Sequence, residues 1–284
     1  MEIINRRQRM FSISRKLRRE EKTVGFVPTM GALHEGHLSL VREARARCDI
    51  VIVSIFVNPE QFNDPTDLES YPRDLTADAA TLAEVGVDYI FAPDVEEIYP
   101  PGFATYVNVE GLTESFEGVS RPGHFRGVAT VVTILLNTVR PNLAFFGQKD
   151  AQQAAVVRRL VADLGFETEV VVMPTVREES GLALSSRNEL LSPEQREQAA
   201  VIISALREAK TAFKQGERNA AALTKIVEDR LAESHGTRPD YVSVVNSETL
   251  QPIEKIGDEE ALILAAACVG DVRLIDNVIL NRKQ

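Results

Sequence analysis

Short apolar runs alternate with longer segments of helical periodicity through the first 175 residues. The run 50–57 is almost entirely apolar and mostly β-branched, which is typical of a strand buried on both faces. Other strand-like runs cover 23–27, 87–91, 143–146 and 167–173, and helical patterns begin at Leu38 and cover 75–85, 128–139 and 152–164. This alternation predicts an α/β fold with a Rossmann-like, doubly wound parallel sheet and helices on both of its faces.

The pattern changes after Asn188. The segment 192–195 combines a serine N-cap, a proline at the first helical position and a glutamine at the third, so it predicts a helix start. A second helical pattern covers 220–234, and strand-like runs follow at 241–246, 262–269 and 274–280. We therefore predict two domains, a Rossmann-like domain at 1–175 and a smaller α+β domain at 176–284.

The most informative segment lies between the first predicted strand and the helix that begins at Leu38. It contains His34 and His37, which share a face on the opening turn of the helix. That turn carries backbone N–H groups without helical partners and the positive end of the helix dipole, so it suits a polyphosphate. A metal site or a structural role are alternatives, although the helical zinc signature places its two histidines four residues apart.

Two further polar motifs follow predicted strands, at the edge where ligands bind in such sheets. Asn58 and Gln61 offer neutral amides for a hydroxyl or carboxylate, and a turn is the alternative role for Asn58. Lys149, in the segment 147–150, offers a positive charge for phosphates, although the spacing is not that of a Walker loop. An ordinary capped helix start explains that segment equally well.

Two further polar clusters each have two alternative roles. Ser185, Ser186 and Arg187 suit phosphate oxygens in a loop that closes over ATP, and a capped turn is the competing interpretation. The segment 121–127 is either a mobile lid or the lead-in to a helix, and we interpret His124 within it as structural.

Composition narrows the functional classes. Apolar residues make up 44 % and charged residues 26 % of the 284 residues, as in soluble globular proteins. The formal net charge of −10 argues against nucleic-acid binding, and the arginine-rich segment 6–19 is interpreted as a solvated helix face. No segment is long enough to span a membrane, and with only Cys48 and Cys268 we expect a reduced, cytoplasmic protein.

Together and in this order, these motifs resemble the pantothenate synthetase (pantoate–β-alanine ligase) family. The resemblance runs through the whole chain and also includes Tyr71-Pro72-Arg73-Asp74 and Gln153. The His-x-Gly-His element alone marks only the wider nucleotidyltransferase superfamily. The resemblance implies that pantoate attacks ATP to give pantoyl adenylate, that β-alanine then displaces AMP, that Mg²⁺ accompanies ATP, and that the enzyme is a homodimer.

The resemblance also implies residue roles. The first domain would bind nucleotide and pantoate, and the second would close over the active site. The implied catalytic residues are His37, as proton donor, and His34, Lys149 and Arg187. The implied pantoate-binding residues are Gln61, Gln153 and Asn58, and Gln61 would also contact β-alanine. No residue is assigned as a metal ligand. ATP binding falls to Met30, Gly31, Ala32, Leu33, His34, Glu35, Gly36, His37, Gly147, Gln148, Lys149, Asp150, Val176, Leu184, Ser185, Ser186 and Arg187.

Two positions depart from the family form, because Ala151 is often aromatic in relatives and Leu184 is often methionine. Both exchanges are apolar and leave the polar contacts in place. Another nucleotidyltransferase of the superfamily and a nucleotide-binding module without turnover are the rival functions. Gln61 and Gln153 argue against a phosphorylated acceptor. The transition-state donors His34, His37, Lys149 and Arg187 argue against a module without turnover. A tRNA ligase is disfavoured by the acidic charge.

Overall fold

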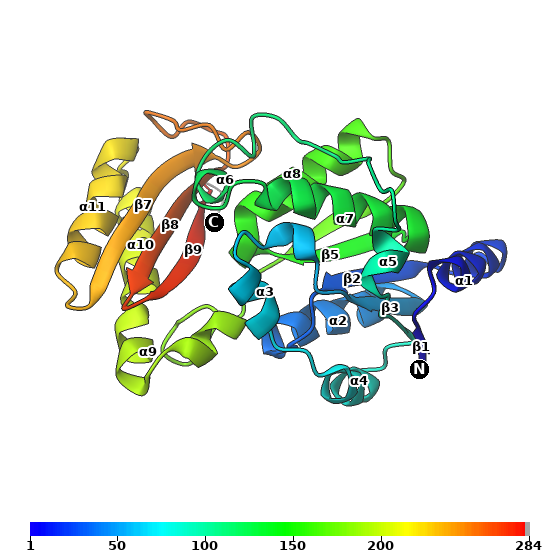
Figure 1. The fold of residues 1–284 in the computed structure, drawn as a ribbon. Coiled ribbons are helices and arrows are strands. Elements are labelled where there is room, and N and C mark those ends of the chain that lie inside the picture. Colours follow the sequence, from blue (N-terminus) through cyan, green and yellow to red (C-terminus); the bar gives the residue numbers. More distant parts are fainter. Residues whose placement is uncertain (282–284) are drawn as a thin grey trace. The chain divides into compact units, whose positions relative to one another are not determined.

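The computed structural model describes residues 1–281 and divides them into two compact units (Figure 1). Unit 1 comprises Met1–Gly147 and Val156–Met173, and unit 2 comprises Gln148–Ala155 and the chain from Pro174 onwards. The helix α8 (Ala151–Asp163) begins in unit 2 and continues into unit 1. No helix among these residues is both long and apolar enough to cross a membrane.

Unit 1 contains a six-stranded, wholly parallel sheet in the order β1-β4-β3-β2-β5-β6. The chain moves outward from β2 through β3 to β4 and then returns to the other side of β2 with β5, so the direction of winding changes between β2 and β5. This arrangement confirms the predicted doubly wound fold, in which ligands bind beyond the strand ends at that change of direction. The strands are β1 (Glu2–Ile4), β2 (Val24–Thr29), β3 (Ile50–Ile55), β4 (Tyr89–Phe91), β5 (Leu143–Gly147) and β6 (Glu169–Met173).

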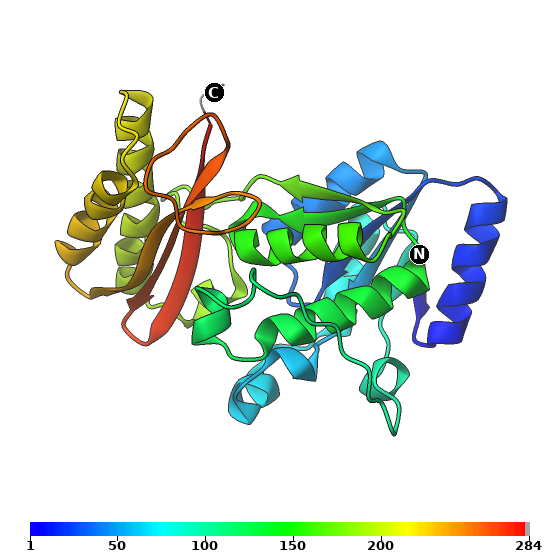
Figure 2. The ribbon, with the colours of Figure 1, turned by 90° about the horizontal axis from the view of Figure 1, so that it is seen from above.

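Helices cover both faces of this sheet (Figures 1 and 2). On one face, α2 contributes Leu40, Val41 and Ala44 and α4 contributes Leu82 to a core that includes Val27 of β2. Because side chains alternate across a strand, Phe26 points to the other face, where it is fully buried. The helices of unit 1 are α1 (Arg7–Arg19), α2 (Glu35–Arg47), α3 (Pro65–Ser70), α4 (Leu75–Glu84), α5 (Val95–Ile98), α6 (Glu117–Ser120) and α7 (His124–Val139), with a 3₁₀ turn η1 (Pro59–Gln61).

Several element boundaries differ from the sequence prediction. The helix predicted to begin at Leu38 begins at Glu35, and the one predicted from residue 128 begins at His124. The strand β1 was not predicted, because three residues carry too little pattern to recognise. The arginine-rich segment is helix α1, whose buried side chains are Met10, Ile13, Ser14 and Leu17. Its arginines are exposed as expected, except Arg7, which is partly buried.

Unit 2 is built on a three-stranded antiparallel sheet in the order β7-β8-β9 (Figure 1). Alternate residues of β8, such as Ile263 and Ala265, lie in one core with Leu206 of α10 and Leu223 of α11. The elements are η2 (Gln148–Asp150), η3 (Ser186–Leu190), α9 (Pro193–Ala199), α10 (Val201–Lys214), α11 (Ala220–Ala232), β7 (Thr237–Asn246), β8 (Ala261–Val269) and β9 (Val272–Leu280).

Candidate active site

The loop that follows β2 is held by a buried carboxylate. The Asp78 side chain on α4 accepts hydrogen bonds from the backbone N–H of Ala32 at 3.1 Å and of Leu33 at 2.9 Å. The loop needs this support because Ala32 adopts a left-handed conformation with φ 51°, which costs free energy for a residue with a Cβ. Gly31 precedes it with φ 86°, and a Cβ there would lie 2.9 Å from the Asp78 Oδ2 atom.

His34 and His37 form a reciprocal cap on α2. His34 is the N-cap residue and His37 the third helical residue. The Nδ1 atom of His34 accepts from the backbone N–H of Gly36 at 3.2 Å, and Nδ1 of His37 accepts from the backbone N–H of His34 at 3.4 Å. The two rings lie with centroids 4.1 Å apart. The histidines are therefore part of the helix start.

This cap changes which groups face a ligand. The prediction of free backbone N–H groups at this turn is wrong for three of them, because the N–H groups of His34 and Gly36 bond to the imidazoles and that of His37 bonds to the His34 carbonyl oxygen. Since both imidazole Nδ1 atoms are acceptors, the hydrogen-bond network places the proton of each neutral ring on Nε2. The imidazole N–H groups of this turn are therefore at Nε2.

Glu35, between the two histidines, is paired with Arg42. Its carboxylate accepts from the Arg42 guanidinium, with one contact of 3.2 Å between Nη2 and Oε2. The hydrogen bond from Arg42 lowers the pKa of Glu35 below its ordinary value. The carboxylate in the first turn also complements the positive end of the helix dipole.

The two predicted amide side chains follow β3, the strand next to β2 in the sheet. Gln61 lies in the turn η1, and Asn58 lies directly before it. Asn58 is 1 % and Gln61 8 % exposed, and the Asn58 Nδ2 amide donates to the Gln61 Oε1 atom at 3.0 Å. The Asn58 Oδ1 atom also caps η1 by accepting from the backbone N–H of Glu60. The turn role that competed with ligand binding for Asn58 is therefore present, together with a direct link to Gln61.

The segment 121–127 leads into α7 and packs on η1. The side chains of Arg121 and His124 both contact the backbone carbonyl of Gln61, each at 3.1 Å. A Cβ at Gly127 would lie 2.2 Å from the Glu60 carbonyl oxygen, so only glycine permits this close approach. The segment thus forms a helix lead-in, and His124, which is buried, has the structural role predicted for it.

In unit 2, the segment 148–150 forms the turn η2 and is clamped by β9. The Asn277 Nδ2 amide donates to the carbonyl oxygens of Gln148 at 2.8 Å and Lys149 at 3.1 Å. Its Oδ1 atom accepts from the Gln148 side chain at 2.9 Å. The Lys149 ammonium lies 3.5 Å from the Asp150 carboxylate. Gln153 follows on the first turn of α8, four residues after Lys149.

The remaining candidates of unit 2 lie on a loop that returns on itself. The Val176 carbonyl accepts from the Leu184 N–H at 3.0 Å, so these two candidates are neighbours. Ser185 is the N-cap of η3, and its hydroxyl accepts from the Arg187 backbone N–H at 3.3 Å. The structure therefore contains the capped turn, which is the alternative to phosphate binding for this segment. Ser186 and Arg187 are both partly exposed.

Sequence reasoning missed three supporting residues. Asp78 holds the loop after β2, Asn277 clamps the turn η2, and Asp276 binds Arg177 through two hydrogen bonds of 2.6 and 3.0 Å. Asp276 is 5 % exposed and ties the loop that begins at Pro174 to β9. A signal was available for two of them, because a polar Asp-Asn pair interrupts the otherwise apolar run 274–280.

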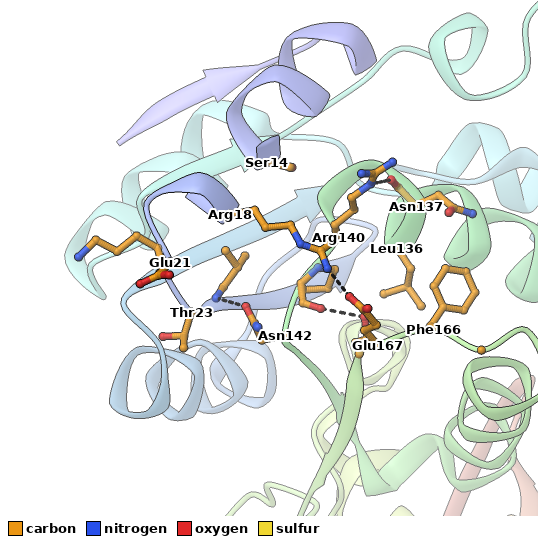
Figure 3. A pocket seen from close by; sticks show the side chains of 15 residues that line it. Ser14, Arg18, Glu21, Thr23, Leu136, Asn137, Arg140, Asn142, Phe166 and Glu167 are labelled. Atoms are coloured by element: carbon orange, nitrogen blue, oxygen red, sulfur yellow. Dashed lines mark hydrogen bonds and ion pairs between the residues drawn. The ribbon is translucent and has the colours of Figure 1, made fainter. Parts of the chain in front are cut away.

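A pocket of about 350 Å³ in unit 1 lies at the amino ends of β2, β5 and β6, whereas the predicted site residues of unit 1 follow the carboxyl ends of strands (Figure 3). It contains none of the predicted site residues. Its lining includes Arg18, paired with Glu167, and Arg140, the left-handed cap of α7. Cations stabilise the negative ends of helices, so a structural role accounts for these arginines.

The fold and the site together define the class of protein. A doubly wound parallel sheet, with an imidazole pair on the helix start after a central strand, is the framework of a Rossmann-like nucleotide-dependent enzyme. A family model described as pantoate–β-alanine ligase matches residues 2–279. The chain is 53 % identical to the pantothenate synthetase of Pelotomaculum thermopropionicum, over 94 % of this chain and 95 % of that protein.

Solved structures agree with this match. A pantothenate synthetase of Thermus thermophilus has a TM-score of 0.93 and 48 % identity, covering 99 % of this chain and 100 % of that one. The pantoate–β-alanine ligase of Francisella tularensis, complexed with beta-gamma ATP and β-alanine, has a TM-score of 0.80 and 38 % identity, covering 98 % and 97 %. The chain belongs to the pantoate–β-alanine ligase family.

Proposed function

We propose that this enzyme condenses pantoate with β-alanine to pantothenate in two steps. A pantoate carboxylate oxygen attacks the α-phosphorus of ATP, so pyrophosphate leaves and pantoyl adenylate forms. The β-alanine amine then attacks the acyl carbon, and AMP leaves. The enzyme mainly has to position the reactants and stabilise phosphate charge, because adenylation turns a carboxylate oxygen into a good leaving group. The family membership and the ligands of the Francisella relative support this reaction.

The observation that carries the proposal is the hydrogen bonding of the imidazole pair to the backbone. His34 and His37 accept backbone N–H groups at Nδ1, so each neutral ring has its proton on Nε2. Two fixed Nε2–H donors on one helix turn suit the phosphate oxygens of ATP and the charge that builds up in the transition state. His37 is the proposed proton donor, and Met30 to His37 form the ATP-binding loop.

Residues of unit 2 receive complementary roles in the proposal. Lys149 supplies a positive charge for phosphates within the nucleotide-binding segment 147–150, and the clamp from Asn277 supports its position. Ser185, Ser186 and Arg187 bind phosphate oxygens during adenylation. Val176 and Leu184 lie along the nucleotide. Gln153, with Gln61 and Asn58 of unit 1, binds pantoate.

Mg²⁺ enters the proposal with ATP. Residues 1–281 bring no three histidine, cysteine or acidic side chains together in a group that could hold a metal ion. Mg²⁺ keeps several waters and is commonly held through substrate phosphates, so ATP supplies most of its ligands here. The family resemblance further supports a homodimer, and two unpaired cysteines agree with a reducing cytoplasmic setting.

The test is pantoate-dependent exchange of labelled pyrophosphate into ATP with Mg²⁺ and without β-alanine. Exchange shows reversible adenylate formation, and added β-alanine should then release AMP and pantothenate. His37→Ala and Lys149→Ala should each lower the exchange rate by roughly 10²–10³, because each removes a donor to transition-state charge. The exposed His235 and Lys225 supply matched controls, since alanine at either position should leave the rate unchanged.

Failure of the wild-type protein to exchange, while folded and binding ATP, would refute the adenylate mechanism. Near wild-type exchange by either active-site variant would remove that residue from the mechanism but leave the reaction in place. Circular dichroism of each variant shows whether it is folded.

A further inference from the structure

The side chain of Asn58 is a fully satisfied amide inside unit 1. Its Nδ2 atom donates to the Gln61 Oε1 atom at 3.0 Å and to the Gly127 carbonyl at 3.1 Å. Its Oδ1 atom accepts from the Tyr99 hydroxyl at 2.8 Å and from the Glu60 backbone N–H at 3.3 Å. These four bonds use both hydrogens and both lone-pair directions of the amide.

Backbone groups fix which way this amide points. The Glu60 N–H can only donate, so it requires the Asn58 oxygen on its side, and the Gly127 carbonyl can only accept, so it requires the nitrogen. The orientation of the Asn58 amide is therefore determined by its hydrogen-bond partners. With Nδ2 directed at Gln61, the atom of Gln61 that faces Asn58 has to be the acceptor Oε1.

In this arrangement, the hydrogen bond from Asn58 does not use the NH₂ group of the Gln61 side chain. Among residues 1–281, the Gln61 Nε2 amide makes no hydrogen bond and is not sealed from solvent, although the residue as a whole is 8 % exposed. An NH₂ group at this position suits a carboxylate or hydroxyl oxygen. It does not suit the ammonium of an amino acid, which would need an acceptor.

The Tyr99 hydroxyl makes the shortest of the four contacts to Asn58. Its ring packs at centroid distances of 5.0 Å from Phe103 and 6.3 Å from Phe56, so the hydroxyl position is set by aromatic packing. Burial, with a smaller effect of the Glu60 charge, raises the pKa of Tyr99 above its ordinary value. The phenol therefore stays protonated and keeps a hydrogen to donate throughout the neutral pH range.

We propose that Tyr99 is a positioning residue that acts through Asn58 to present the Gln61 amide NH₂ as a donor to the carboxylic acid substrate. The inference rests on the proposed function, because it takes pantoate as that substrate. Without the hydroxyl, the Asn58 oxygen keeps only its 3.3 Å contact with Glu60. The Asn58 side chain can then move, and the Gln61 amide loses its fixed orientation.

The test compares Tyr99→Phe with a matched control, Tyr106→Phe. Tyr99→Phe retains the ring and removes one buried hydrogen bond, so the KM for pantoate should rise about 3- to 10-fold. The KM for ATP should change little, and the unfolding midpoint should fall only slightly, because one buried hydrogen bond is lost. Tyr106 packs against Phe103 at 5.4 Å in the same aromatic cluster but has no hydroxyl contact to Asn58, so its variant should match the wild type.

A double-mutant cycle separates positioning from general support of the fold. Gln61→Glu is nearly isosteric and removes the NH₂ group, so Tyr99→Phe should have no further effect on the KM for pantoate in that background. An unchanged KM for pantoate in Tyr99→Phe, an equal rise in the KM for ATP, or additive effects in the cycle would overturn the inference. Absence of pantoate-dependent exchange in the wild type would instead refute the proposed function.

Discussion

Replacing Asp78 by asparagine tests whether one buried carboxylate holds the loop that carries the imidazole pair. Asp78 is 6 % exposed and accepts from two consecutive backbone N–H groups, those of Ala32 and Leu33. Asparagine can serve one of these N–H groups with its oxygen, but its NH₂ group faces the other, so one buried donor loses its partner. The left-handed φ of 51° at Ala32 then loses the interaction that offsets its cost.

The magnitude follows from the hydrogen bond that the substitution removes. A hydrogen bond to a charged group contributes about 1.5–3 kcal/mol, and an unpaired buried donor costs a similar amount, so we expect a loss of roughly 2–3 kcal/mol. If the loss falls wholly on the loop, it lowers the equilibrium ratio of competent to incompetent loop by roughly 30- to 150-fold. The variant should therefore show a large fall in kcat/KM for ATP while the core under the sheet stays folded.

The assay is pyrophosphate exchange as a function of ATP concentration, with thermal unfolding measured in parallel. Ala32→Gly is the matched comparison, because glycine relieves the left-handed strain and keeps both hydrogen bonds to Asp78. Combining it with Asp78→Asn should restore part of the missing activity. Wild-type kcat/KM for ATP in Asp78→Asn, with an unchanged unfolding midpoint, would refute the reasoning that Asp78 holds the loop.

Two further outcomes follow from ion pairs and hydrogen bonds away from the loop. Asp276→Asn leaves the Arg177 side chain, which is 18 % exposed, without its carboxylate partner. The free energy of unfolding measured in urea should therefore fall by about 2–4 kcal/mol. A fall below about 0.5 kcal/mol would contradict the importance of this pair. Asp49 accepts from the backbone N–H and hydroxyl of Thr23, which lowers the pKa of Asp49 below its ordinary value. A carboxyl with a lowered folded pKa adds stability that is present above its unfolded pKa, about 4, and is lost as the pH falls through the folded pKa. Asp49→Asn should therefore flatten the fall of urea midpoints below about pH 4, and an unchanged slope would contradict this.

The sequence by itself determined the class of fold and most of the candidate residues. The runs 50–57 and 143–146 are short, apolar and separated by helical patterns, and such a chain can bury its strands only in a parallel sheet covered on both faces. Because ligands bind at the carboxyl ends of such strands, the polar motifs at 30–37, 58–61 and 147–150 could be singled out before the structure. Cap signals were equally local, as Ser192 and Gln195 show by forming the reciprocal cap of α9.

Only the tertiary structure decided what each polar group is bonded to. His34 and His37 looked like additions to a turn with free N–H groups, yet they cap that turn themselves, and Asp78, more than forty residues away, takes the N–H groups before them. Likewise, Asn277 reaches Lys149 and Tyr99 reaches Asn58 across long stretches of sequence. Periodicity reports which face of an element is buried, but it carries no information on partners brought together by the packing of separate elements. For that reason the supporting residues of this site became visible only in the folded chain.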